Sequence, residues 1–229
     1  MTAVTPQIFD LRTTPLRAMN QHLHHAVPAG QVRIEHPDGA HNIAVGLDGP
    51  WNVQVFGHTG YYCAGMNQHA TVTVHGNAGP GVAENMMSGR VHVKGFASVA
   101  AGASGHGGLL VIDGDASLRC GISMKGIDIV VGGSVGSFSG FMAQAGRMVV
   151  CGDAGDALGD SLYEAVIYVR GAIKSLGADA RIEPMTEVDI ADVAALLAEA
   201  GLPHDPAGFK RVASARGLYH WHADADQEY

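Results

Sequence analysis

A repeat of nineteen residues runs from Val53 to Gly171 without a change of phase. Its landmark is a glycine that ends a short apolar alternation. Apolar residues precede each landmark by two and by four positions, as Val74 and Val72 do in the second repeat. Such uniform columns indicate one supersecondary unit stacked many times. The landmark recurs at Gly57, Gly76, Gly95, Gly114, Gly133, Gly152 and Gly171.

The repeat length selects the fold class. Alternation of apolar and other residues predicts a strand with one buried face. Nineteen residues are too few for a helix hairpin or a propeller blade, but they fit one coil made of three short strands with a corner between each. At a corner, glycine can take positive φ or leave room where coils stack closely. We therefore expect an all-β solenoid, a single-stranded parallel β-helix of about nineteen residues per coil.

Glycine-rich segments also occur as flexible linkers and phosphate loops. The stretch from Gly133 to Gly136 invites the phosphate-loop interpretation, but its glycines belong to the periodic columns and so need no local chemistry. Valine and isoleucine recur with the period of the repeat, which argues against a flexible linker. A zinc enzyme of the gamma carbonic anhydrase type is the main enzyme alternative, although that family uses a different, hexapeptide-based coil.

The segments before and after the repeat predict three regions in the chain: 1–30, 31–182 and 183–229. In the first, Thr14 and Pro15 form a helix start, and the helix has an apolar face made of Leu16, Met19, Leu23 and Ala26. We expect this helix to cap the open end of the rod or to dock on a partner.

Residues 31–52 predict an irregular first coil, since terminal repeats are usually atypical. We expect Ile34 to be in phase with Val53, and Ile43 with Val45 to form another strand of this coil. At the other end, Ile173 and Leu176 complete one more coil.

The C-terminal region predicts a helix that starts at Thr186, with Asp189 completing a partial capping box. Its apolar stripe is Val193, Leu196, Leu197 and Ala200. We expect a further short helix from about Pro206 to Ala215 that seals the far end of the rod. The tail is rich in aromatic residues, and an aromatic terminus suits docking into another subunit; folding back onto the rod is the alternative. The possible docking residues are Tyr219, Trp221 and Tyr229.

Charge and hydropathy restrict the partners. Only 16% of the residues are charged, and the formal net charge is -8 with neutral histidines. That balance argues against nucleic acid and anionic membranes as partners. No apolar run reaches about 18 residues, and no signal peptide is readable, so we expect a cytoplasmic protein.

The sequence gives only weak indications of a metal-binding or catalytic site. The three cysteines, Cys63, Cys120 and Cys151, are odd in number and widely spaced, which does not predict disulfides or a metal cluster. His22, His24 and His25 allow a metal site, but a polar helix face is the simpler interpretation. A serine column (Ser104, Ser123, Ser161) and aspartates near the corners (Asp113, Asp115, Asp153, Asp156) fit structural periodicity and turns. We therefore assign no catalytic, cofactor-binding or metal-binding residue.

The repeat and its corners resemble the GXGXG domain, the C-terminal β-helix of the glutamate synthase large subunit, which formylmethanofuran dehydrogenase also contains in one of its chains. The flanks FDLRTTPLRAMNQHLH and FKRVASARGLYHWHADADQEY are similar to one branch of that family. In that branch the β-helix is a free-standing subunit of N-methylglutamate synthase and of related glutamate-synthase-like complexes. The resemblance covers nearly the whole chain.

The resemblance implies a right-handed solenoid and a non-catalytic subunit of an amidotransferase-like complex. The partners would be a class II glutaminase-like subunit and a subunit that carries FMN and iron–sulfur clusters. The complex would make N-methylglutamate from methylamine and glutamate, or transfer ammonia as glutamate synthase does. The chain begins Met1-Thr2-Ala3, without the N-terminal cysteine of such a glutaminase. The alternatives are a formylmethanofuran-dehydrogenase-type subunit and a self-sufficient metal-dependent β-helix enzyme.

Overall fold

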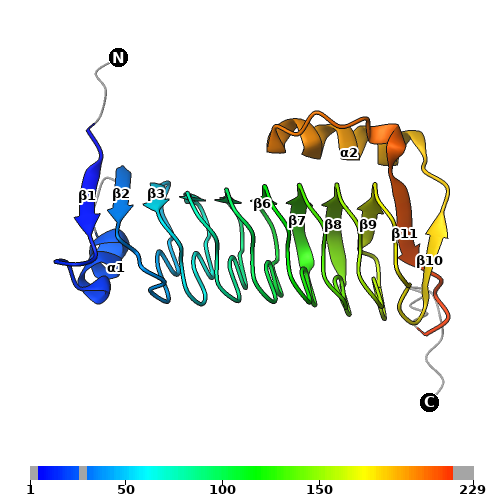
Figure 1. Cartoon of the computed structure of the whole chain (residues 1–229), viewed down its shortest axis with the longest axis horizontal. Coiled ribbons are helices and arrows are strands. Elements are labelled where there is room, and N and C mark those ends of the chain that lie inside the picture. Colours follow the sequence, from blue (N-terminus) through cyan, green and yellow to red (C-terminus); the bar gives the residue numbers. More distant parts are fainter. Residues whose placement is uncertain (1–4, 26–29, 219–229) are drawn as a thin grey trace, which may run out of the picture.

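The computed structural model describes residues 5–25 and 30–218, and they form a rod of stacked coils (Figure 1). Eleven strands make one sheet in the order β1-β2-β3-β4-β5-β6-β7-β8-β9-β11-β10, parallel from β1 to β9. The strands are β1 (Gln7–Asp10), β2 (Gln31–Glu35), β3 (Asn52–Phe56), β4 (Thr71–Val74), β5 (Arg90–Val93), β6 (Leu109–Ile112), β7 (Lys125–Val131), β8 (Ala145–Val150), β9 (Val166–Val169), β10 (Ala180–Glu183) and β11 (Lys210–Ser214). The helices are α1 (Leu16–His25), α2 (Glu187–Ala200) and the 3-10 turn η1 (Pro206–Gly208).

The strand register confirms the nineteen-residue coil. Val53 pairs with Val72, Val72 with Val91, and Val91 with Leu110. Because each step advances one period, identical columns lie on top of one another along the rod. The predicted parallel solenoid is therefore correct.

Each coil contains one regular strand and not the three that we expected. A second side is held by an isolated bridge in each coil, as between Thr59 and Ala78. The third side is a turn segment in which every second residue is left-handed, as at Tyr62, Ala64 and Met66 (φ 62°, 54° and 54°). Alternating conformations cannot form an extended strand. We call this side the turn strip, comprising residues 61–66, 80–85, 99–104, 118–123 and 137–142.

The landmark glycines are needed because neighbouring coils approach closely at these positions, and not because the backbone there has a left-handed φ. Among the seven, only Gly57 has a left-handed φ, of 140°. A Cβ placed on Gly76 would lie 2.5 Å from the carbonyl oxygen of Gly57, and one on Gly114 would lie 2.9 Å from that of Gly95. These columns therefore need glycine because the backbone of the preceding coil occupies the space of a side chain.

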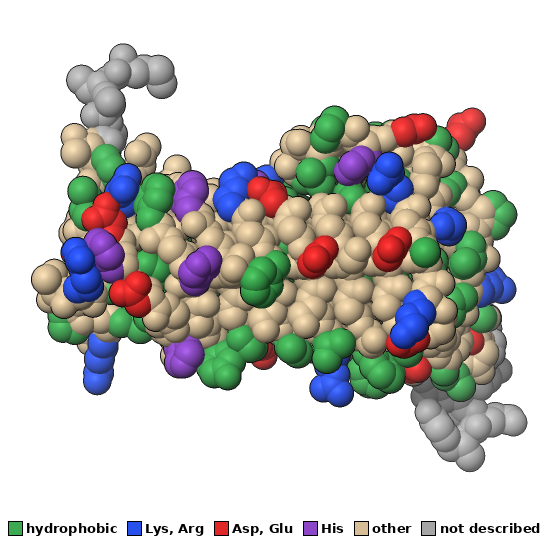
Figure 2. All heavy atoms as spheres, viewed as in Figure 1, with side chains coloured by type: hydrophobic (Ala, Val, Ile, Leu, Met, Phe, Trp, Pro, Cys, Tyr) green, Lys and Arg blue, Asp and Glu red, His purple; other side chains and the backbone are tan. Residues whose placement is uncertain are grey.

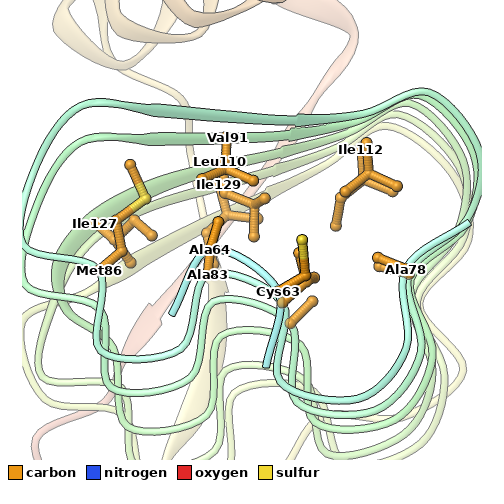
Figure 3. Packing of buried hydrophobic residues seen from close by; sticks show 14 of the residues in the cluster. Cys63, Ala64, Ala78, Ala83, Met86, Val91, Leu110, Ile112, Ile127 and Ile129 are labelled. Carbon is orange, nitrogen blue, oxygen red and sulfur yellow. The ribbon is translucent and has the colours of Figure 1, made fainter. Parts of the chain in front are cut away.

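The rod interior is filled by aliphatic columns. Val91, Leu110 and Ile129 follow one another in successive coils and are completely buried, with Met86 and Ile127 beside them (Figure 3). Burying such a side chain contributes roughly 1.5–3 kcal/mol. Stacking of like residues thus supplies the stabilisation that holds neighbouring coils together.

The first coil differs from the expectation. Val32, and not Ile34, pairs with Val53, so the step from β2 to β3 is longer than the nineteen-residue step that follows it. The segment at Ile43 and Val45 is a turn and not a strand, because Ala44 between them has φ 55°. Ile173 does complete a last coil, as expected, through a bridge with Ala154.

Helix α1 caps the N-terminal end of the rod, where Met19 and Leu23 are buried in the core (Figure 1). Its polar side chains also bond the first turn segment. Asn20 donates to the carbonyl oxygen of Asn42 (2.8 Å) and accepts from the amide of Ala44 (3.1 Å). These contacts satisfy backbone groups that a preceding coil would otherwise bond. Ala26 lies outside the described residues.

At the other end, one prediction is confirmed and one is wrong. Thr186 and Asp189 form a complete capping box at the start of α2, and Gly201 ends the helix in the left-handed conformation. The expected helix from Pro206 to Ala215 is absent: only η1 is helical, and Lys210–Ser214 is strand β11. That strand inserts antiparallel between β9 and β10, so a strand seals the rod.

Candidate functional site

The outer face of the sheet changes character along the rod. In β4 and β5 its outward residues are polar, as at Thr73 and His92. From β6 to β9 one outward column, which includes Val111 and Val149, is apolar and buried, and α2 covers it (Figure 1). In β6, whose sequence is LLVI, the residues that point to either side of the sheet are all apolar, which indicates a strand buried on both faces. The sequence contained this signal, which our prediction of an end-capping role for the C-terminal region did not use.

Polar contacts fix α2 along the rod axis. Tyr168 on β9 donates a hydrogen bond to Asp189 in the first turn of the helix (2.7 Å). Arg147 on β8 pairs with Asp192 (2.8 Å), and Arg90 on β5 donates to the carbonyl oxygen of Glu199 in the last turn (2.8 Å). The helix therefore crosses the strands from β9 to β5.

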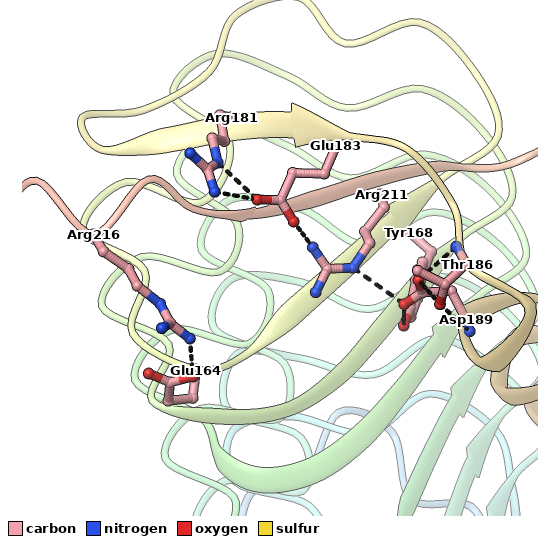
Figure 4. A network of polar contacts seen from close by, with 8 residues as sticks. All are labelled: Glu164, Tyr168, Arg181, Glu183, Thr186, Asp189, Arg211 and Arg216. Carbon is pink, nitrogen blue, oxygen red and sulfur yellow. Dashed lines mark hydrogen bonds and ion pairs between the residues drawn. The ribbon is translucent and has the colours of Figure 1, made fainter. Parts of the chain in front are cut away.

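A polar network joins α2 to the end of the rod (Figure 4). Arg211 on β11 pairs with Asp189 (3.1 Å) and with Glu183 on β10. Although burial opposes ionisation, hydrogen bonds from Thr186 and Tyr168 hold the pKa of Asp189 below its usual value. Burial and the adjacent Asp189 raise the pKa of Tyr168. Both groups thus keep their ordinary charge states, and the network is a structural anchor.

A small cavity of about 180 Å³ lies beside this network. Three arginines line it, but each has a carboxylate partner: Arg181 and Arg211 share Glu183, and Arg216 pairs with Glu164 (3.2 Å). Paired guanidinium groups leave little free charge to hold an anionic ligand.

The stretch from Gly133 to Gly136 is a structural corner. The amide of Gly133 bonds the carbonyl oxygen of Gly114 and that of Gly136 bonds Ala116, both at 3.0 Å. The N–H groups that a phosphate would need are therefore engaged between coils. Side chains continue this pattern: Asp115 accepts from the amide of Ser134 (2.7 Å), and Asp153 accepts from that of Ala172 (2.7 Å). These two aspartates serve the corners, as expected.

The remaining candidates are dispersed. Cys63 and Cys120 lie in the interior three coils apart, and burial raises the pKa of each thiol to about 12. Cys151 is packed in the cluster under α2, so the cysteines do not converge on one cluster site. His24 binds the carbonyl oxygen of Val45 (2.7 Å), and so serves the N-terminal cap. Within the described residues, no three side chains of His, Cys, Asp or Glu gather so that they could hold a metal ion.

The serine column occupies left-handed positions of the turn segments, including Ser104 and Ser123 (φ 52° each) and Ser161 (φ 57°). The tail residues Tyr219, Trp221 and Tyr229 lie outside the described residues, so their docking role stays a prediction.

Neither helix in residues 5–25 and 30–218 has the length and apolar character that crossing a membrane requires.

The most distinctive exposed surface is the turn strip. Five of its large apolar side chains are between 39% and 55% exposed, and Figure 2 shows hydrophobic side chains along the lower edge of the rod, where the turns lie. A groove of about 350 Å³ opens there between Val99, Leu118 and Phe138. The exposed set is Tyr61, Met66, Leu118, Phe138 and Met142. Exposed apolar residues that gather on one side of a molecule are typical of an interaction site.

Stacked coils, capped ends and an apolar side define a parallel β-solenoid protein with a candidate protein-binding surface. The chain is 60% identical over 226 residues to Protein GlxC of Rhizobium meliloti (strain 1021), a match that covers 97% of this chain and 99% of that protein. The chain therefore belongs to the GlxC family. No model of a known protein family matches it, and no solved structure does.

Proposed function

We propose that this chain is a structural subunit of a glutamate-synthase-like amidotransferase complex, of the N-methylglutamate synthase type. In this role it positions a class II glutaminase-like subunit and a subunit that carries FMN and iron–sulfur clusters. The assembled complex forms N-methylglutamate from methylamine and glutamate. The chemistry takes place on the partners, and this chain supplies their relative placement.

One observation carries the proposal: a regular rod leaves large apolar side chains of its turn strip uncovered. The chain covers the outer face of β6–β9 with its own helix α2, but no described element of the chain covers the turn strip. A partner protein removes such a surface from water at about 25 cal/mol per Å² of apolar area. The repeat and the flanks, which resemble the GXGXG subunits, indicate which complex supplies that partner.

The cysteines of this chain suit the assignment of iron–sulfur clusters to a partner. Two of them are separated by three coils in the interior, and the third lies beneath α2. A cluster needs four ligands close together. FMN and clusters therefore belong, in this proposal, to the other subunit.

Co-purification tests the proposal. The tagged chain is co-expressed with a glutaminase-like subunit and an FMN-type subunit, and the eluate is analysed by native mass spectrometry. We expect both subunits to elute with the chain in a fixed ratio. A chain that is soluble, monodisperse and retains neither subunit would contradict the proposal.

Elemental analysis of the same purified chain separates the alternative. A self-sufficient metal-dependent β-helix enzyme would carry zinc or iron in stoichiometric amount. We expect less than about 0.1 zinc or iron ions per chain, well below the one metal ion that a catalytic site holds. A stoichiometric metal that survives dialysis would favour the alternative.

A further inference from the structure

The turn strip has a chemical character of its own. In the five coils from residue 61 to residue 142, its charged residues are Glu84 and Arg119. Neither has an ion-pair or side-chain hydrogen-bond partner among the described residues, although the chain forms ion pairs elsewhere. A partner that covers the strip therefore meets an apolar surface with one unpaired charge of each sign.

Alternate backbone amides of the strip are already paired. The amide of Arg119 bonds the carbonyl oxygen of Ser137 in the next coil (3.0 Å), and that of Gly121 bonds Ala101 in the preceding coil (2.8 Å). Tyr62 and Ala64 repeat the pattern near the other end of the strip. Because these groups are bonded between coils, the strip does not present the continuous hydrogen-bonding edge that an added strand needs. An α-helix satisfies its own backbone and therefore suits such a surface.

The spacing of the rod also suits a helix. Coils stack about 4.8 Å apart, close to the 5.4 Å pitch of an α-helix. A helix laid along the rod axis can therefore place one apolar side chain per turn near each coil. The chain uses this arrangement itself, since α2 runs across the strands from Tyr168 on β9 to Arg90 on β5 (Figure 1).

We infer that the turn strip is the docking site for an amphipathic helix of a partner subunit, laid along the rod axis. Its apolar side chains contact Leu118 and Phe138 and the groove between them. It carries an acidic residue opposite Arg119 and a basic residue opposite Glu84. This inference rests on the proposed function and names the surface and the kind of element that the partner contributes.

The partial burial of Glu84 is compatible with a cation at that position. The carboxyl group is half-buried, and desolvation raises its pKa. A lysine or arginine of the partner helix would offset this desolvation. Arg119 is exposed and lies two coils further along the strip with the opposite charge, so the two charges also set the direction in which the helix docks.

Two other occupants are possible in principle. The C-terminal segment after Leu218 begins on the last coil, where the amide of Leu218 bonds Asp179 (3.2 Å). Its eleven residues span at most about 36 Å, enough to reach the strip. A second copy of the chain could also cover the strip with its own. Cross-linking distinguishes both of these occupants from a helix of a partner subunit.

The test is site-specific photo-cross-linking in the co-expressed complex, with p-benzoylphenylalanine at Phe138 and, as control, at Val188 on α2, which is 70% exposed. We expect Phe138, and not Val188, to cross-link to a helical peptide of a partner subunit. A cross-link from Phe138 to residues 219–229 of the same chain, or to a second copy, would overturn the inference. A Phe138 probe that labels nothing while the complex is intact would do so too.

Variants give a second readout. Leu118→Glu with Phe138→Glu should weaken binding of the partner by about a hundredfold or more, because hot-spot residues dominate an interface. Arg119→Glu should weaken it by about tenfold, Arg119→Lys by less than about threefold, and the control Val188→Glu by less than about twofold. If the Leu118→Glu/Phe138→Glu double variant and the Arg119→Glu variant both kept the wild-type affinity and melting temperature, the inference would be overturned. The proposed function would still stand. If the wild-type chain bound neither subunit, both would fall.

Discussion

At the scale of single residues, the glycine columns mark places where backbone meets backbone. The sequence predicted which glycines matter, because the period is visible without any structure. It left two reasons open, namely positive φ or close approach. Gly114 shows the second, since φ lies outside the left-handed region while the Gly95 carbonyl fills the space of a Cβ. The left-handed positions fall elsewhere in the coil, many of them on alanine or serine, as at Ala83 and Ser104.

Replacing Gly114 with valine should lower the free energy of unfolding by about 2 kcal/mol or more, the range of overpacked sites. The reason is steric: a Cβ would lie 2.9 Å from the carbonyl oxygen and 3.2 Å from the carbonyl carbon of Gly95. Urea denaturation measures the change. Gly208→Ala is the matched control, because no atom lies within 4 Å of its Cβ position, and it should change stability by less than about 0.5 kcal/mol. Equal effects of the two substitutions would contradict the stacking explanation.

At the scale of elements, helix α2 was predictable and its location was not. Its capping box and its stripe are local patterns, readable from Thr186 to Ala200. Its docking on the outer face depends on apolar residues of strands that precede it in the chain, such as Val149 and Tyr168. The segment Lys210–Ser214 was predicted as helix because short segments carry little periodicity, and its pairing with β9 and β10 decided for strand.

Thr186→Ala tests the capping box of α2. The threonine hydroxyl accepts from the amide of Asp189 (3.2 Å) and donates to its carboxylate (2.6 Å). Losing an N-cap costs about 1 kcal/mol of stability, within a range of about 0.5–2. Thermal unfolding followed by circular dichroism measures the loss, with Glu187→Ala, an exposed change in the same turn, as the control. A control that destabilises as much as Thr186→Ala would speak against the box.

Asp189 predicts an acid dependence of stability. Its pKa is lower in the folded protein than in the unfolded chain, so the folded state binds the proton less readily. The stabilisation is fully present above the unfolded value of about 3.9 and is lost as the pH falls through the folded pKa. Asp189→Asn should therefore cost about 1–3 kcal/mol at pH 7, and the gap to the wild type should narrow below about pH 4. A gap that is constant from pH 7 to pH 3 would contradict the assignment.

At the scale of the whole molecule, repetition made the architecture predictable and made the function hard to see. The columns specify a rod, but they also place serine, cysteine and aspartate at regular positions that imitate sites. The candidate interface became visible only when exposure showed that Leu118 and Phe138 lie outside the core while Val91 and Ile129 lie inside. The sequence could not show this, because the turn segments alternate in conformation and their apolar residues follow neither a strand nor a helix period.

The central claim is that the nineteen-residue coil is the unit of this fold, and removing one coil tests it most directly. Deleting residues 54–72 joins Val53 to Thr73 and keeps every column in phase, whereas deleting 54–71 joins Val53 to Val72 and shifts the strand by one residue. We predict that the first variant is soluble and unfolds in one cooperative transition with a melting temperature within about 10 °C of the wild type, as stacked repeats allow. The second should lose cooperative unfolding or aggregate. Identical behaviour of the two deletions would contradict the account.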